Sequence, residues 1–142
     1  MILMPSRVKH RKEQRGRRRG AAKGGTTLAF GSFGLKALET CWMNARQMEA
    51  LRVCLTRGLK KGGKVWIRMF PNKPVSAKPL ETRMGKGKGA PARWVAVIKR
   101  GRIVVEIDGV DRATAVAALR QGAFKLPIAT RVVERLSLEG LG

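Results

Sequence analysis

Residues 94–107, WVAVIKRGRIVVEI, contain the strongest fold signal in the chain. Two runs of five residues, 94–98 and 103–107, are apolar except for Glu106 and are rich in β-branched side chains, which favour extended backbone. A short basic segment with one glycine separates them, as expected for a tight turn. The pattern predicts two antiparallel strands that pair with each other as a hairpin.

Helical patterns lie on both sides of these two strands. Asn44 is a good N-cap with Gln47 three positions later, which predicts a helix from about Ala45 to Leu59. Its expected buried face consists of Met48, Leu51, Leu55 and Leu59, and the glycines at 62 and 63 are expected to end it. Asp111 is the expected N-cap of a second helix, from Arg112 to about Phe124. Its expected buried side consists of Ala115, Val116, Leu119 and Ala123.

Shorter apolar patterns predict further strands within residues 26–38, 65–70 and 128–136. Strands outnumber helices, so the predicted fold class is α+β, a mostly antiparallel sheet with two helices packed on one face. The expected domain organisation is a basic extended tail over 1–25, a single domain over 26–136 with a protruding glycine- and lysine-rich loop over 79–92, and a frayed end over 137–142.

The charge balance predicts a polyanionic partner. The chain has 31 lysines and arginines against 9 acidic residues, a net charge of +22. Nucleic acid is the expected polyanion, because a membrane partner would call for a long apolar run or a strongly amphipathic basic helix. The first residues turn basic without a signal-peptide core, which favours an intracellular protein. Cys41 and Cys54 form no CxxC pair and His10 is the sole histidine, so neither a metal nor a cofactor is expected.

The tail is the most basic segment and has little to bury. Alone it is expected to be largely disordered and to become ordered on a polyanion, although a merely solubilising tail is the alternative. Its candidate phosphate contacts are Arg7, Lys9, Arg11, Lys12, Arg15, Arg17, Arg18, Arg19 and Lys23. The polar face of the first helix and the turn after it add further candidates, with an ordinary solvated face as the alternative. These are Arg46, Arg57, Lys60, Lys61 and Lys64.

The predicted loop has a tip suited to a phosphate-rich surface. Three glycines in five positions let the backbone come close to another molecule, and three cations accompany them without an acidic residue. The alternative is a flexible, solvated tip. The tip consists of Arg83, Met84, Gly85, Lys86, Gly87, Lys88 and Gly89.

No catalytic pattern emerges from the sequence. Gly85, Gly87 and Ala90 match a dinucleotide fingerprint only formally, because Pro91 and a strand follow instead of a helix. Glu106 and Asp108 are the closest carboxylates, without an evident partner that would make either a general acid. The chain has seven aromatic residues and no tyrosine, so base stacking is expected to be a minor mode at most. A tryptophan in a strand, such as the one at position 66, is more often part of the core.

Several stretches resemble the bacterial-type family of large-subunit ribosomal protein sixteen, the counterpart of eukaryotic large-subunit protein ten. They are RVKHRKEQRGRRRG at 7–20, FGSFGLKALE at 30–39, RQMEA at 46–50, GGKVWIRMFPNKP at 62–74, KPLETRMGKGKG at 78–89 and KLPI at 125–128. The resemblance covers almost the whole chain in order, and the segment 66–89 is its most specific part.

The resemblance implies a non-catalytic protein that binds large-subunit ribosomal RNA beside the peptidyl-transferase centre and helps position tRNA in the aminoacyl and peptidyl sites. It implies that the tip 83–89 faces tRNA and that the tail threads among RNA helices. The implied partners are ribosomal RNA, tRNA and neighbouring ribosomal proteins, with no membrane and no small-molecule substrate. The implied location is the ribosome, cytoplasmic or organellar.

Two other functions remain open at this stage. One is a free architectural protein that binds DNA or RNA off the ribosome. The other is a nucleotide-dependent enzyme that uses the glycine- and lysine-rich loop to hold phosphates.

Overall fold

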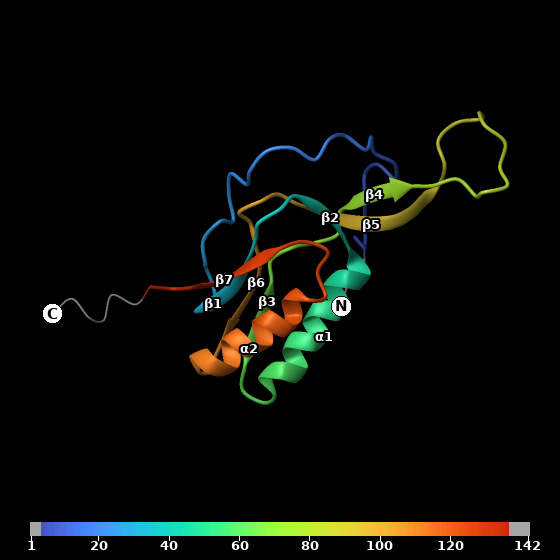
Figure 1. Cartoon of the computed structure of the whole chain (residues 1–142). Helices are drawn as coiled ribbons and strands as arrows, with labels where there is room; N and C mark the ends of the chain where they lie inside the picture. Colours follow the sequence, from blue (N-terminus) through green and yellow to red (C-terminus); the bar gives the residue numbers. More distant parts are fainter. Residues whose placement is uncertain (1–3, 137–142) are drawn as a thin grey trace.

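The computed structural model describes residues 4–136, and the expected frayed end at 137–142 lies outside that range. It confirms the α+β class (Figure 1). The elements in chain order are β1 (Phe33–Ala37), β2 (Cys41–Asn44), α1 (Ala45–Leu59), β3 (Lys64–Ile67), β4 (Lys73–Ser76), β5 (Pro91–Ile98), β6 (Ile103–Asp108), α2 (Arg112–Ala123) and β7 (Thr130–Glu134).

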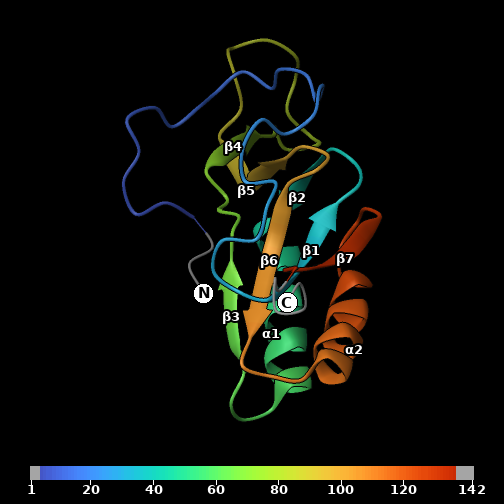
Figure 2. The ribbon, with the colours of Figure 1, turned by 90° about the vertical axis from the view of Figure 1, so that its left-hand side faces the viewer.

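The strands form two antiparallel sheets (Figures 1 and 2). One has four strands in the order β3-β6-β1-β7, and the other has three in the order β2-β5-β4. The predicted hairpin between residues 94–98 and 103–107 is therefore wrong, although both strands exist. β5 pairs with β2 and β4, whereas β6 pairs with β1 and β3.

Hydrogen bonds at the end of β1 explain why β5 and β6 do not pair with each other. The Gly101 N–H donates to the Ala37 carbonyl at 2.6 Å, and the Ala37 N–H donates to the Arg102 carbonyl at 2.8 Å. Gly101 has φ 93°, a backbone conformation that glycine adopts without a steric penalty. The turn is thus bonded to β1, and the chain crosses there from the three-stranded to the four-stranded sheet.

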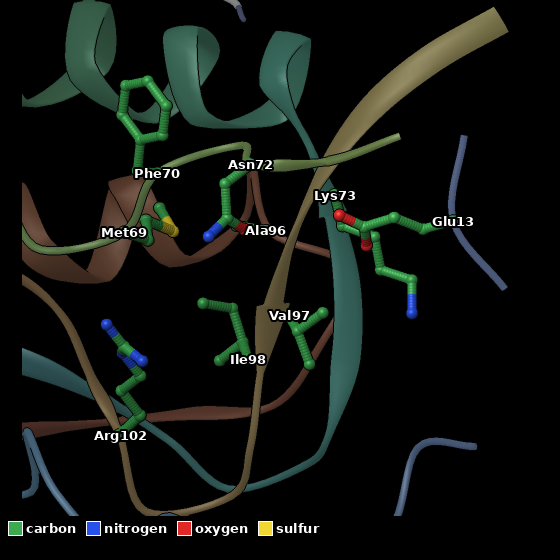
Figure 3. Close-up of a pocket in the computed structure, with 9 residues that line it drawn as sticks. All are labelled: Glu13, Met69, Phe70, Asn72, Lys73, Ala96, Val97, Ile98 and Arg102. Atoms are coloured by element: carbon green, nitrogen blue, oxygen red, sulfur yellow. The ribbon is translucent and has the colours of Figure 1, made fainter. Parts of the chain in front are cut away.

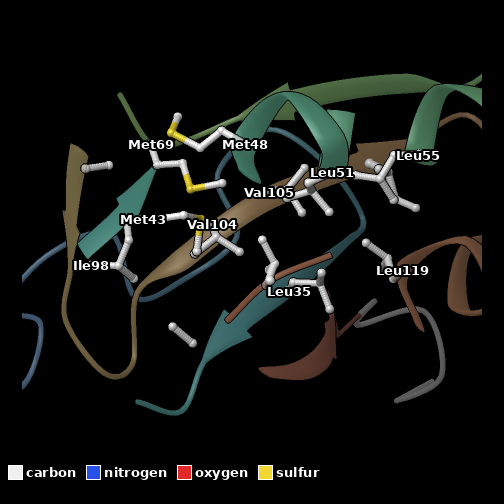
Figure 4. Close-up of a cluster of buried hydrophobic side chains, with 14 of the residues drawn as sticks. Leu35, Met43, Met48, Leu51, Leu55, Met69, Ile98, Val104, Val105 and Leu119 are labelled. Atoms are coloured by element: carbon white, nitrogen blue, oxygen red, sulfur yellow. The ribbon is translucent and has the colours of Figure 1, made fainter. Parts of the chain in front are cut away.

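Both helices lie on one face of the four-stranded sheet (Figures 1 and 2). α1 buries Met48, Leu51, Leu55 and Leu59, as predicted. In the core, side chains of α1 and α2 meet those of β1 and β6, including Leu35, Val105 and Leu119 (Figure 4). Each such fully buried aliphatic side chain contributes about 1.5–3 kcal/mol of transfer free energy, so this face supplies much of the driving force for folding.

The buried face of α2 differs in part from the prediction. It consists of Ala115, Ala118, Leu119 and Gly122. Val116 and Ala123 are only half-buried. A Cβ on Gly122 would lie 2.8 Å from a Leu51 methyl carbon, so a glycine there lets the two helices approach closely.

Both helices begin where their N-cap residues predicted, but α1 does not end at the glycines that were expected to stop it. The Asn44 N–H donates to the Gln47 side-chain oxygen at 3.0 Å, and the Asp111 carboxylate accepts from the Thr114 N–H at 3.3 Å. α1 ends at Leu59, and Lys60 has φ 55°, ahead of the glycines expected to provide the stop. Lys60 and the lysine after it therefore lie in a turn beyond the helix.

Two short strands had no clear signal in the sequence. β2 directly precedes α1, and β4 lies in a segment expected only to be extended. Proline at position 74 is compatible with β4 because this strand is at an edge of its sheet and needs no donor there. β3 and β7 are shorter than the apolar patterns that predicted them. Within residues 4–136, no helix has the length and apolar character needed to cross a membrane.

Candidate nucleic-acid interface

The loop between β4 and β5 projects away from the body of the domain (Figure 1). At its base, the Ala77 N–H donates to the Ala90 carbonyl at 3.2 Å, and β5 begins at the next residue. Side chains along the loop are exposed, and those of Leu80 and Met84 are essentially fully accessible. A strand follows the GKGKG stretch, as the sequence predicted, so the phosphate-binding strand–loop–helix arrangement is absent from this described segment.

The loop tip has an unusual backbone. Three consecutive residues have positive φ, with values of 96° at Gly85, 60° at Lys86 and 90° at Gly87. Glycines tolerate this conformation, whereas a lysine pays a small steric cost for it. The Lys78 ammonium donates to the Gly85 carbonyl at 2.5 Å across the loop. The result is a tight turn that carries the exposed Lys86 side chain at its apex.

The tail runs along the end of the molecule that carries β4 and β5 (Figure 2). It contacts the domain largely through its backbone. The Ala22 N–H donates to the Arg100 carbonyl at 2.9 Å, and the Gly25 carbonyl accepts from the Ile103 N–H at 2.8 Å. The Arg15 carbonyl accepts from the Lys73 ammonium at 2.6 Å. The side chains of residues 6–20 are exposed, so most of the predicted cations face outward.

The tail and the loop meet directly. The Lys12 ammonium donates to the Lys88 carbonyl at 3.0 Å, and the Lys88 ammonium donates to the Glu13 carbonyl. Lys12 and Lys88 lie 76 positions apart in the sequence. The tail and the loop, which are both rich in cations, thus form one basic region. Further along the tail, the Arg18 guanidinium lies 5.1 Å from the centre of the Trp42 ring, an attractive cation–π distance.

A pocket of about 410 Å³ lies beside the tail (Figure 3). Its titratable lining residues are Glu13, Lys73 and Arg102, and Met69 and Ile98 contribute apolar surface. The described lining contains no serine, cysteine or histidine, which are the usual nucleophiles and bases. No residue of the loop tip 83–89, on which the hypothesis of a nucleotide-dependent enzyme rests, is among these lining residues.

Most of the remaining predicted cations lie away from this basic region, although Arg46 at the start of α1 lines a pocket with Met4 of the tail and residues 92–94 of β5. Arg46 and Arg57 are exposed on α1, and the lysines at 60, 61 and 64 are exposed around its C-terminal end. A helix of 15 residues is about 22 Å long, and α1 runs away from the loop (Figure 1). The structure thus separates the predicted contacts into a tail-and-loop region and a second group along α1.

Sequence reasoning missed an anchor on the opposite face of the four-stranded sheet. Glu106 is fully buried. It accepts hydrogen bonds from the N–H groups of Ala29, Phe30 and Gly31 at 2.6–2.9 Å and from Arg68 at 2.8 Å. Burial raises the pKa of the Glu106 carboxyl, but the backbone donors and Arg68 together lower it further, so the net pKa is below its usual value. Glu106 therefore has partners that hold it ionised, unlike a general acid.

Comparison with known proteins identifies the family of this chain. The model of the family described as ribosomal protein L16p/L10e matches residues 5–133, which include both the tail and the loop. The large ribosomal subunit protein uL16 of Lactobacillus helveticus (strain DPC 4571) is 60% identical over 140 residues, covering 99% of this chain and 96% of that protein. The chain is accordingly a structural protein of the large ribosomal subunit, with ribosomal RNA and other ribosomal proteins as partners. From its sequence and its fold, the chain belongs to the ribosomal protein L16p/L10e family.

Proposed function

We propose that this protein binds ribosomal RNA beside the peptidyl-transferase centre and that its loop helps position tRNA in the aminoacyl and peptidyl sites. The observation that carries the proposal is the loop itself. It projects from the domain, its apex residue Lys86 is exposed, and residues 83–89 contain three cations and no carboxylate. Such a tip can reach the phosphates of a molecule that lies beyond the surface of the domain.

The distribution of charge supports different ligands for the tail and the loop, ribosomal RNA for the tail and tRNA for the loop. The tail presents most of its cations outward, because it is attached to the domain largely through its backbone N–H and carbonyl groups. In the particle it contacts ribosomal RNA, and the cations along α1 make a second RNA contact. Because Lys12 and Lys88 join the tail to the loop, RNA that fixes the tail also restricts where the loop can lie. The chemistry of peptide-bond formation belongs to RNA, and the role of this protein is positioning.

The loop assignment is tested by replacing Lys86 and Lys88 with alanine in purified ribosomes. We expect tRNA affinity in the aminoacyl site to fall several-fold, because two cations near phosphate are lost, while large subunits still assemble. Equilibrium filter binding of tRNA and sedimentation of the subunits provide the two readouts. The matched control is Arg120→Ala with Lys125→Ala, which removes the same charge at exposed positions around the end of α2 that belong to no proposed contact, and leaves tRNA affinity unchanged. Equal losses in both variants would refute the assignment of the loop to tRNA.

A further inference from the structure

An exposed aromatic surface lies on the edge of the four-stranded sheet, away from the loop. It consists of Phe30, Trp66 and Arg68. The Phe30 and Trp66 rings stack with their centres 6.2 Å apart and their planes 19° apart, and the Arg68 guanidinium lies 5.7 Å from the centre of the Phe30 ring. Phe30 nevertheless remains 57% exposed. A large apolar ring that is held in place and left open to solvent indicates a binding surface.

The surface is held in position from beneath. The Phe30 N–H donates to the buried Glu106 carboxylate at 2.6 Å. Arg68 Nη1 donates to the same carboxylate and to the Thr27 carbonyl, each at 2.8 Å. The Phe30 backbone and the Arg68 guanidinium are thus anchored to one buried group, and Trp66 packs against the Phe30 ring, so little conformational freedom is lost when a ligand arrives.

The surroundings favour RNA as the ligand. The aromatic surface borders a shallow hollow of about 610 Å³ that also includes Phe70 and Arg102. The described lining contains two arginines, of which Arg68 is paired with the buried Glu106 carboxylate, so Arg102 is the one available to a phosphate. Because β3 is an edge strand, this side of the sheet is open. Aromatic faces next to guanidinium groups match the two parts of a nucleotide, the base and the phosphate.

We infer that an unpaired base of ribosomal RNA stacks on the exposed surface of Phe30 and Trp66, with its phosphate near Arg102. The inference rests on the proposed RNA binding. The sequence indicated that the protein recognises RNA almost entirely through phosphates, and the inference adds a contact to a base. Ribosomal RNA is the expected source of the base because β3, the strand that carries Trp66, lies on another part of the domain from the tip proposed to face tRNA (Figure 1).

The first test compares two probes with the full-length chain, an adenosine decamer and an abasic decamer with the same phosphates. Phe30→Leu removes the ring but keeps the backbone N–H that binds Glu106. We expect this variant to bind the adenosine decamer about tenfold more weakly, since one lost base–aromatic stack has an effect of this order. The abasic decamer should bind both proteins equally. The matched control is Phe124→Leu, because Phe124 is 85% exposed at the end of α2, which packs beside the other edge of the sheet.

The outcomes separate the two proposals. If Phe30→Leu binds both decamers as the unaltered chain does, the stacking inference is overturned while salt-dependent RNA binding stands. If neither decamer binds the unaltered chain, RNA binding itself fails. Circular dichroism of each variant establishes that it is folded, and the abasic decamer reports any general loss of binding.

The second test uses large subunits purified from cells that carry Phe30→Leu or Phe124→Leu. Acylation of 2′-hydroxyl groups reports the mobility of each nucleotide. We expect at least one unpaired ribosomal RNA nucleotide to become more reactive in the Phe30→Leu subunits without tRNA, and no such change in the Phe124→Leu subunits. Ribosomal RNA reactivity identical to that of unaltered subunits, or the loss of a neighbouring ribosomal protein with no change in RNA reactivity, would overturn the inference.

Discussion

The carboxylate of Glu106 lies 2.8 Å from the Nη1 atom of Arg68, and both belong to the face of the sheet opposite the helices. Three consecutive backbone N–H groups, of residues 29–31, complete the coordination of this carboxylate. The buried charge is therefore paired and hydrogen-bonded, which offsets much of its desolvation cost. One side chain on β6 thereby holds the segment before β1 and the residue after β3 in place.

Replacing this carboxylate should destabilise the protein strongly. Glu106→Gln keeps the shape but removes the charge, leaving Arg68 unpaired and one N–H facing an amide donor. We expect the free energy of unfolding to fall by about 3 kcal/mol. Urea denaturation of the full chain measures it. Glu134→Gln is the control, because Glu134 forms an exposed pair with Arg112 at 2.9 Å and its loss should cost far less. Similar losses in both variants would contradict the anchoring role.

The same group should make stability depend on pH. The pKa of Glu106 is lowered in the folded protein, so its stabilising contribution is fully present above the pKa of an unfolded glutamate, about 4.3. That contribution is lost as the pH falls from there through the lower folded value. The difference in unfolding free energy between the unaltered chain and Glu106→Gln should therefore shrink below about pH 4. A difference that stays constant from pH 7 to pH 3 would show that the charge is not responsible.

A second stability prediction concerns Gly34 in the middle of β1. A Cβ there would lie 2.6 Å from a methyl carbon of Leu28 and 2.8 Å from the Val105 carbonyl oxygen. Because β1 pairs on both sides, backbone must move to make room. Gly34→Ala should lower the free energy of unfolding by about 1–3 kcal/mol, as overpacking does. Gly24→Ala, where a Cβ meets nothing within 4 Å, should change it little, and thermal melts of both variants provide the comparison.

Deletion of residues 1–24 tests the tail. The shortened chain keeps Gly25, whose carbonyl binds the Ile103 N–H, so it should still unfold cooperatively. Its affinity for large-subunit RNA should fall broadly, and the slope of log K against log salt should decrease by about 0.7–0.9 for each lost phosphate contact. Filter binding over a series of salt concentrations measures the slope. An unchanged slope would mean that the tail makes no phosphate contacts.

Local sequence patterns predicted which residues form helices and strands better than they predicted which strands pair. Asn44 and Asp111 start helices because an N-cap acts within three residues of itself. The partners of β5 and β6 could not be predicted from residues 99–102, since a basic turn with a glycine suits both a hairpin and a crossing between sheets. The hydrogen bonds that decide between them involve Ala37, more than sixty positions away.

The candidate RNA-binding residues were likewise predictable from the sequence, whereas the contacts between them were not. Cations and glycines of the tail and loop are visible in the sequence because charge is a property of composition. Their contact through Lys12 and Lys88 was not predictable, and neither was the position of Phe30 beside Trp66. Each of these contacts joins residues that are far apart along the chain.

By itself, the sequence determined that this protein is a strongly basic α+β domain with a cationic tail and a glycine-rich loop, because charge and short-range periodicity are local properties. Only the tertiary structure decided that the strands divide between two sheets, that tail and loop form one region, and that Glu106 anchors an open aromatic surface. These features depend on hydrogen bonds and packing between distant segments, which exist only once the chain has folded.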